Sequence, residues 1–270
     1  MSARVAAEQW RTRPMTEQRW PHRLWIIRHG ESAGNVARDA AHAAGLARID
    51  IDYRDVDVPL SELGERQSCA LGRWYASLPK DHRPDVVMTS PYVRARQTGE
   101  LMRKAGGFAL EADEAFRSDE RLREKEFGIL DRLTRTGITE LHPDQAEFRR
   151  LLGKFYHRPP GGESWCDVIL RLRSALDTIS LHYSGRRVLI LTHQVVVLCM
   201  RYLLENLTEN EILEIDRQKD VANCAITEYR FDSTAGAGGG LVLERYNYVT
   251  PMEAAGAPVT AKPDFSVGAR

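Results

Sequence analysis

Short apolar runs without internal polar residues restrict the fold of this 270-residue chain more than any other feature. Three of them, at residues 24–27, 86–88 and 188–191, lack the polar alternation of a strand that has one face in water. Such strands are covered on both faces, as in parallel sheets. We expect a fourth strand at residues 225–231. These runs predict a central sheet with helices on either side.

Helical patterns separate the predicted strands. Ser61 can cap a helix that ends near Pro79, and a second helix follows Pro91. The clearest helix begins at Ser164 and closes at Gly185, with apolar residues at helical spacing: Trp165, Val168, Ile169, Leu172, Leu176 and Ile179. Strands that alternate with helices predict an α/β fold, here a three-layer α/β/α sandwich with a largely parallel central sheet.

The charge balance excludes several classes of partner. Lys and Arg total 38 and Asp and Glu total 38, so the formal net charge is zero. Chains that coat nucleic acid or an anionic membrane carry an excess of basic residues, so we expect neither partner. Residues 195–200 form one of the longest apolar runs, far short of the roughly 20 residues that cross a bilayer.

Cysteine usage and the first residues point to the cytoplasm. The four cysteines lie far apart, without a C-x-x-C pair, which argues against a disulfide scaffold and favours a reducing compartment. The N-terminal segment contains arginines but no continuous apolar stretch, so it does not read as a secretory signal. We therefore expect a cytoplasmic protein.

The chain divides into a central α/β region and two extensions. Residues 1–21 are polar, broken by prolines, and we expect a flexible N-terminal extension. The α/β pattern fills residues 22–232. Residues 233–270 form a Gly-, Ala- and Pro-rich C-terminal extension, with a flexible connector at 233–240, an extra strand expected at 241–248 and a loosely ordered remainder.

Polar residues follow three of the predicted strands. The first strand runs into Arg28 and His29, the strand at 188–191 into His193, and the strand at 86–88 into a segment that contains Arg94. Ligands of parallel sheets bind beyond the carboxyl ends of the strands, so these side chains are expected at one edge. Their combination is more informative than any single member, because a lone histidine after a strand is usually structural.

Phosphoryl transfer through histidine suits this set of groups. Arginine offers planar, bidentate donors to a phosphate dianion, and a neutral imidazole can attack phosphorus and carry the group. We expect a protonated His193 to balance the phosphate oxygens together with Arg28 and Arg94. The leaving oxygen also needs a proton from a carboxylic acid. Three candidates lie in one charged segment, Glu120, Glu124 and Glu126, and the pattern alone does not select among them.

Six blocks of residues, in order, resemble the signature of the histidine phosphatase superfamily, the phosphoglycerate mutase-like proteins. They span about residues 24–231 and are Arg28-His29-Gly30-Glu31-Ser32 with Asn35, Asp57-Val58-Pro59-Leu60-Ser61-Glu62-Leu63-Gly64, Ser90-Pro91 with Arg94-Ala95-Arg96-Gln97-Thr98, Leu122-Arg123-Glu124 with Phe127-Gly128, Gly161-Gly162-Glu163-Ser164, and Thr192-His193. An Arg-His-Gly triplet alone would be a weak signal, whereas six ordered blocks are a strong one.

The resemblance implies a role for each matched residue. His29 would be the phosphorylated nucleophile, and Glu124 the proton donor. The phosphate pocket would contain Arg28, Arg94 and His193. Ser32 and Asn35 would lie beside it and contact the phosphate or the rest of the substrate. The family implies no metal and no cofactor, and the partner would be a small phosphorylated substrate; a homodimer remains open.

Two departures from the family pattern bear on specificity. Gln194 follows His193 where many members have glycine, and its side chain could narrow the pocket and contact substrate. The chain between Glu124 and Gly162 lacks the larger insertion of the glycolytic mutases, so the resemblance favours a phosphatase over a mutase. Hydrolysis of a phosphomonoester without a metal is therefore the expected activity.

Other functions remain as alternatives. The chain could be a phosphoglycerate mutase, or a catalytically idle member that binds phosphorylated ligands or a protein partner. A zinc hydrolase built on His29 and His193 is disfavoured, since two arginines would repel the cation. A zinc deaminase is disfavoured too, because Glu31 is followed by no P-C-x-x-C motif. The Gly161-Gly162 pair is equally compatible with a phosphate-binding loop and with an ordinary turn.

Overall fold

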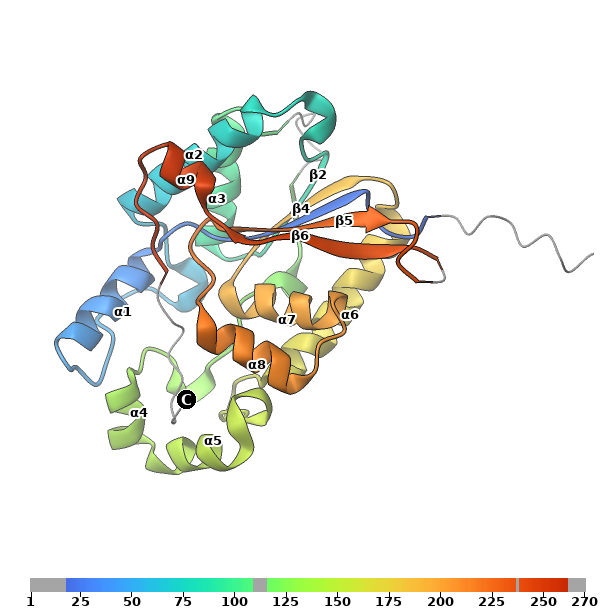
Figure 1. The fold of residues 1–270 in the computed structure, drawn as a ribbon. Helices are drawn as coiled ribbons and strands as arrows, with labels where there is room; N and C mark the ends of the chain where they lie inside the picture. Colours follow the sequence, from blue (N-terminus) through green and yellow to red (C-terminus); the bar gives the residue numbers. More distant parts are fainter. Residues whose placement is uncertain (1–17, 109–115, 237, 262–270) are drawn as a thin grey trace, which may run out of the picture.

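A six-stranded sheet forms the centre of the computed structural model, which describes residues 18–108, 116–236 and 238–261 (Figure 1). The spatial order of the strands is β3-β2-β4-β1-β5-β6. Their bounds are β1 Arg23–Arg28, β2 Val86–Thr89, β3 Phe116–Ser118, β4 Arg187–Thr192, β5 Ile226–Asp232 and β6 Gly240–Tyr248. Strands β1 to β4 are mutually parallel, whereas β5 and β6 are antiparallel additions at one edge. The largely parallel sheet predicted from the apolar runs is confirmed.

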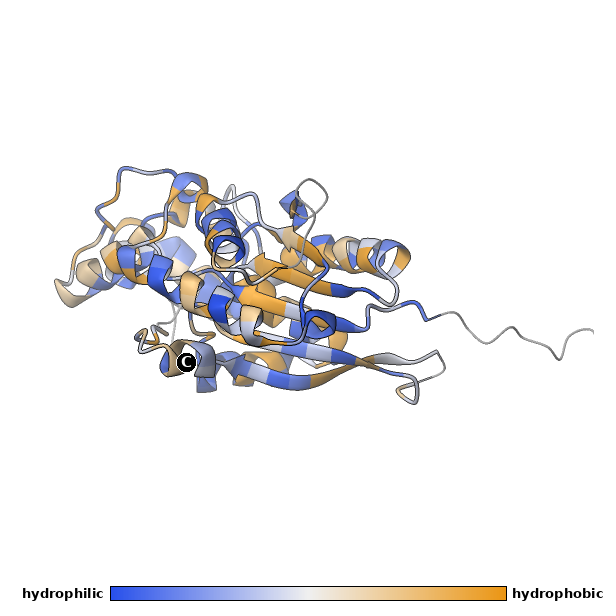
Figure 2. Cartoon of the chain, turned by 90° about the horizontal axis from the view of Figure 1, so that it is seen from above, coloured by the Kyte–Doolittle hydropathy of each residue, from blue (hydrophilic) through white to orange (hydrophobic). Residues whose placement is uncertain are grey.

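Both faces of the inner strands are buried, which explains why their sequences do not alternate. In β1, Leu24 and Ile26 pack into one hydrophobic core, while Trp25 and Ile27 pack into a second core on the opposite face. The strands at the centre of the molecule are accordingly hydrophobic in Figure 2. Burying large apolar side chains on both faces stabilises this sheet by about 1.5–3 kcal/mol per side chain.

Helices cover the two faces of the sheet, as a three-layer sandwich requires (Figure 1). One layer contains α2 (Glu62–Ser77), α3 (Val93–Lys104) and the short α9 (Thr250–Ala254). The other contains α6 (Trp165–His182), α7 (Gln194–Leu204) and α8 (Glu209–Gln218). The expected caps are present, since the hydroxyls of Ser61 and Ser164 accept hydrogen bonds from the first turns of α2 and α6.

Further elements gather near the carboxyl ends of the parallel strands. Helix α1 (Ala33–Ala43) follows β1 directly, and α4 (Arg135–Leu141) and α5 (Pro143–Tyr156) form a separate pair at the same end of the molecule (Figure 1). Single 3₁₀ turns also lie between the larger elements. They are η1 Asp55–Asp57, η3 Glu120–Leu122, η4 Gly128–Leu130 and η2 Lys80–His82, of which η2 precedes the amino end of β2. Helices α1, α4 and α5 were not predicted from the sequence, because each buries only one or two residues and so carries no extended apolar stripe.

The C-terminal extension is more ordered than its composition suggested. Strand β6 pairs with β5, and α9 then packs on α2 through the buried Pro251 and Met252. The chain continues along α2 to residue 261, with Ala257 buried. Residues 1–17 and 262–270 of the two extensions lie outside the described residues. Within the described chain, none of the helices combines the length and the apolar character that crossing a bilayer demands.

Candidate active site

The ends of β1 and β4 bring the two histidines together. These strands are neighbours, with Arg28 in register with Thr192, and the His29 amide donates to the Thr192 carbonyl at 2.9 Å. The imidazole centroids of His29 and His193 are 5.1 Å apart. The third segment enters from β2, where the Ser90 amide donates to the Leu191 carbonyl at 2.9 Å. Three separate segments therefore converge at one sheet edge.

The hydrogen bonds of His29 define which ring nitrogen can react. Its Nδ1 lies 2.6 Å from the Gly30 carbonyl oxygen, which can only accept, so Nδ1 carries the proton. Nε2 is then unprotonated, and Arg94 Nε donates to it at 3.2 Å. Burial, followed by the charges of Arg94 and Arg28, holds the pKa of His29 well below its ordinary value. His29 is therefore a neutral imidazole, and the lone pair of Nε2, the atom that could attack phosphorus, accepts the hydrogen bond from Arg94.

Close packing fixes the loop that carries His29. The Gly30 amide donates to Thr98 Oγ1 at 3.1 Å, and a Cβ at Gly30 would lie 2.5 Å from the carbonyl oxygen of Gly64. Real Cβ atoms do not approach a carbonyl so closely, so the loop passes α2 only with glycine at this position. The position of the imidazole thus depends on backbone contacts on both sides of the loop.

Two arginines and an aspartate lie around His29. Arg28 is buried and donates through Nη1 to the Val221 carbonyl at 2.6 Å. Arg94, on the first turn of α3, donates through Nη1 to the Asp55 carbonyl at 2.5 Å and lies 3.1 Å from the Asp55 carboxylate. A phosphate on His29 would need the same guanidinium donors. Asp55, which was not predicted from the sequence, therefore holds donors of Arg94 that a bound phosphate would use.

His193 is fully buried between other site groups. Its Nε2 lies 2.8 Å from Ser90 Oγ, and its Nδ1, among the described residues, has no hydrogen-bond partner. Burial and the charge of Arg94 lower the pKa of His193 well below its ordinary value. Burial and the charge of Arg94 therefore both work against the protonated His193 that the sequence predicts.

Of the three candidate carboxylates, Glu124 is the one that lines the cavity. It is buried, lines the same cavity as His29, and accepts a hydrogen bond from the Lys125 amide at 2.8 Å. The other two candidates are not among the lining residues: Glu120 is exposed in η3, and Glu126 accepts from the Tyr92 hydroxyl at 3.0 Å. The structure thus distinguishes candidates that the pattern left equivalent.

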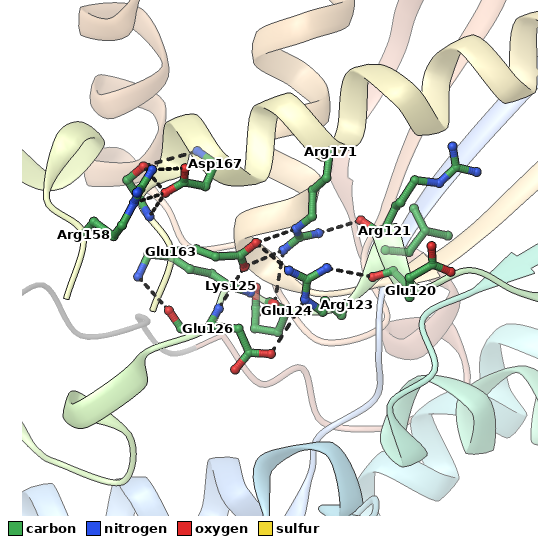
Figure 3. A network of polar contacts seen from close by, with 12 residues as sticks. Glu120, Arg121, Arg123, Glu124, Lys125, Glu126, Arg158, Glu163, Asp167 and Arg171 are labelled. Carbon is green, nitrogen blue, oxygen red and sulfur yellow. Dashed lines mark hydrogen bonds and ion pairs between the residues drawn. The ribbon is translucent and has the colours of Figure 1, made fainter. Parts of the chain in front are cut away.

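A network of ion pairs anchors the segment that carries Glu124 (Figure 3). Arg171 of α6 donates to the Glu124 carbonyl at 3.2 Å and to the Arg121 carbonyl at 2.5 Å. Glu163 accepts from Arg171 at 2.9 Å, from Arg123 at 2.7 Å and from the Glu126 amide at 3.0 Å. The charged run at residues 120–126 is therefore tied to the sandwich by buried contacts.

Gly161 and Gly162, the two glycines before α6, belong to a turn that packs against the segment carrying Glu124. The two segments approach so closely at Gly128, which has a φ of 56°, that a Cβ there would lie 2.1 Å from the Pro160 carbonyl oxygen. The Glu163 amide donates to the Glu126 carbonyl at 2.9 Å. Neither Gly161 nor Gly162 is among the residues that line the cavity. The pair therefore forms a turn that packs on the Glu124 segment. Of the two interpretations that the sequence left open, a phosphate-binding loop and an ordinary turn, the structure supports the turn.

The cavity beside His29 has a volume of about 160 Å³, and both polar and apolar side chains line it. The predicted catalytic residues Arg28, His29, Arg94 and Glu124 are among them. The other lining residues are Ser32, Gly34, Asn35, Arg38, Ile49, Ile51, Tyr53, Asp55, Val58, Phe127, Leu130, Asp131, Arg132, Leu133 and Ile138. Apart from Ser32 and Asn35, these residues were not predicted from the sequence, because they come from segments that meet only in the folded chain.

Of the other residues expected to contact substrate, Ser32 and Asn35 line the cavity and Gln194 does not. Ser32 and Asn35 line the cavity and also form the capping box of α1, which orients both side chains. Gln194 does not line the cavity: its side chain is buried and donates to Asp220 at 3.2 Å. Within residues 18–108, 116–236 and 238–261, no group of three or more His, Cys, Asp or Glu side chains is arranged to hold a metal ion.

Comparisons with known proteins identify the family of this chain. The model of the histidine phosphatase superfamily (branch 1) matches residues 24–238. A probable phosphoglycerate mutase GpmB of Yersinia enterocolitica is 26% identical over 223 residues, covering 82% of this chain and 90% of the relative. A probable phosphoglycerate mutase GpmB of Salmonella paratyphi C is 27% identical over 233 residues, covering 86% of this chain and 95% of the relative.

Solved structures share the fold. Bacillus stearothermophilus YhfR superposes with a TM-score of 0.66 at 25% identity, covering 85% of this chain and 98% of that one. The mycobacterial glucosyl-3-phosphoglycerate phosphatase in complex with inorganic phosphate gives a TM-score of 0.61 at 20% identity, with 85% and 99% of the two chains covered.

Proposed function

Because the chain belongs to the histidine phosphatase superfamily (branch 1), we propose that it is a phosphomonoesterase that acts through a phosphohistidine on His29. One observation carries the proposal. The hydrogen bond from Nδ1 to the Gly30 carbonyl leaves Nε2 unprotonated, beside Arg94 and in the cavity that Glu124 also lines. A nucleophile, a cation for the phosphate and an acid thus share one cavity.

The first half-reaction follows from these positions. The phosphate draws Arg94 away from the Asp55 carboxylate and from Nε2 of His29, which frees the Nε2 lone pair, and the arginines hold the phosphate oxygens. His29 Nε2 attacks phosphorus, the P–O bond to the leaving group breaks, and Glu124 in its acid form gives its proton to the leaving oxygen. The dianion also favours a proton on His193, because it reverses the unfavourable field of Arg94.

The second half-reaction restores the enzyme. Glu124, now a carboxylate, accepts a proton from a water molecule that attacks the phosphohistidine. The bond between phosphorus and Nε2 breaks, and inorganic phosphate leaves as Asp55 returns to Arg94. Protons and phosphate balance without a further reactant, and we propose that no metal takes part.

The apolar residues in the cavity lining support a phosphatase with a small organic phosphate ester as substrate. The walls at Ile49, Leu133 and Ile138 favour the burial of carbon rather than of further phosphate groups. We further propose a cytoplasmic location, which the four free cysteine thiols support.

Phosphoglycerate mutase activity is the second candidate, since the relatives named above are probable phosphoglycerate mutases. Arg38 and Arg132 also line the cavity and carry the charge that a substrate carboxylate needs. Conversion of 3- to 2-phosphoglycerate with a bisphosphorylated primer, at a rate above phosphate release, would support this candidate over hydrolysis.

A series of phosphate monoesters with leaving groups of different pKa tests the proposal. In the presence of a chelator, the wild-type protein should release phosphate, and His29→Ala should abolish release. Glu124→Gln should slow alkyl phosphates by about 100-fold or more and activated aryl phosphates far less, since only poor leaving groups need the proton. Glu120→Gln is the matched control and should behave as wild type. Persistent turnover by His29→Ala would refute the mechanism.

A further inference from the structure

Two amide side chains hold the backbone of the His29 loop. Gln67 Oε1 accepts from the Glu31 amide at 2.9 Å, and Asn223 Nδ2 donates to the His29 carbonyl at 3.0 Å. Each amide side chain has a donor end and an acceptor end, and a flip exchanges them. A flip of Gln67 would place a donor against the Glu31 amide, and a flip of Asn223 would place an acceptor against the His29 carbonyl. The loop is held only while both amides keep one orientation.

A single hydroxyl from the C-terminal extension contacts the far end of both amides. Thr260 Oγ1 accepts from Gln67 Nε2 at 3.0 Å and donates to Asn223 Oδ1 at 3.0 Å. A hydroxyl can accept and donate at once, so it satisfies the two amides in the orientations that the loop needs. The backbone N–H of Asn223 also donates to the Thr260 carbonyl at 2.9 Å, and Gln67 Nε2 donates to the Pro258 carbonyl at 2.8 Å.

These contacts form a continuous path from the extension to the nucleophile. Thr260 lies beyond the part of the chain that the family model matches, which ends at residue 238. It reaches the loop because α9 packs on α2 and directs the following residues along that helix. The same asparagine lies 3.5 Å from the Asn35 oxygen, so the path also touches the cap of α1.

We propose that Thr260 is a positioning residue for His29, acting through the orientations of Gln67 and Asn223. The inference rests on the proposed function in one respect, that His29 is the nucleophile. Its structural part, the constraint on the loop backbone, does not require turnover.

Thr260→Val tests the proposal, because valine keeps the shape of threonine and removes the hydroxyl. A misplaced nucleophile of this kind costs roughly 10- to 100-fold in kcat. KM should change less than about twofold, since the arginines that bind phosphate are unaffected. Thr260→Ser restores the hydroxyl and should restore kcat. Hydrogen exchange of the Glu31 amide should accelerate about fivefold or more in the valine variant and remain slow in the serine variant.

Thr234→Val is the matched control. Thr234 belongs to the same extension, and its hydroxyl donates to Asp232 in the exposed turn before β6. This variant should show wild-type kcat and wild-type exchange at Glu31. A Thr260→Ala variant repeats the test in case valine does not fit, and thermal unfolding identifies a variant that has lost its fold.

The outcomes separate the two proposals. Wild-type exchange and kcat in both Thr260→Val and Thr260→Ala would overturn the positioning role. Loss of kcat in Thr260→Ser equal to that in Thr260→Val would also overturn it, since the hydroxyl would then be irrelevant. If the wild-type protein releases no phosphate, the proposed function fails, while faster exchange at Glu31 in Thr260→Val still supports the constraint on the loop.

Discussion

Replacement of Glu163 by glutamine tests whether buried ion pairs hold the general acid in place. Glu163 accepts hydrogen bonds from Arg171, Arg123 and the Glu126 amide (Figure 3). Burial works to raise the pKa of its carboxyl, but the bonds and charge of Arg171 more than offset this, so the pKa is lowered. The carboxylate is therefore the form that the network needs.

The size of the stability loss in Glu163→Gln follows from the burial of the ion pair. The side chains of Glu163 and Arg171 are 12% and 10% exposed, so the pair is largely removed from water. Removing one charge of a buried pair costs about 3–5 kcal/mol, and the glutamine oxygen retains part of the hydrogen bonding. We expect a loss of about 3 kcal/mol in the free energy of unfolding. For a chain of this size that corresponds to a fall in Tm of roughly 6–12 °C.

Activity should fall together with stability. Arg171 also donates to the Glu124 carbonyl, so an unpaired Arg171 loosens the segment that carries the acid. At a temperature where the variant is fully folded, kcat for an alkyl phosphate should fall about tenfold, and kcat for an activated aryl phosphate should fall less.

The matched control is Glu214→Gln, which breaks an ion pair with Arg217 in which both side chains are about half exposed. Such surface pairs contribute about 0–1 kcal/mol, so Tm should barely change. Differential scanning calorimetry and steady-state kinetics compare the two variants. Equal changes in Tm and kcat for Glu163→Gln and Glu214→Gln would refute the reasoning.

Three further perturbations have definite expected outcomes. The pKa values of His29 and His193 are lowered in the folded chain, so as the pH falls the unfolded chain binds protons first. The free energy of unfolding should therefore decline between about pH 6.5 and 5, by at most about 1.4 kcal/mol per pH unit for each histidine. Urea titrations at a series of pH values measure this decline. A flat profile would contradict this. Gly30→Ala should lower kcat at least 10-fold, because its Cβ displaces the nucleophile loop, and unchanged kcat would contradict the packing. Asp55→Asn should tighten inorganic phosphate several-fold in calorimetric titrations by releasing Arg94; weaker binding would contradict the competition.

The sheet and the main site residues were predictable because their signals are local. An apolar run such as residues 24–27 reports burial on two faces, and the residue after it must lie at a strand end. That reasoning placed His29 and His193 on one edge, where β1 and β4 prove to be neighbours. The roles of individual residues came from the resemblance to the family, since spacing alone could not separate Glu124 from Glu120 and Glu126.

The rest of the site depends on contacts between distant segments. Asp55 reaches Arg94 only because η1 packs near α3, and the walls at Ile49 and Leu133 meet only in the folded chain. The neutral state of His193 follows from its complete burial, which a sequence does not quantify. The contacts of Thr260 required an ordered path for a segment whose Pro- and Ala-rich composition suggested the opposite.

A rapid-quench measurement with radiolabelled aryl phosphate and the Glu124→Gln variant tests the central claim most directly. Loss of the general base slows water attack, so the covalent intermediate should accumulate. We predict a phosphate that is labile in acid and stable in base, located on the peptide that contains His29. A covalently bound phosphate on a different residue, or a single turnover by excess enzyme that never labels the protein, would contradict the account.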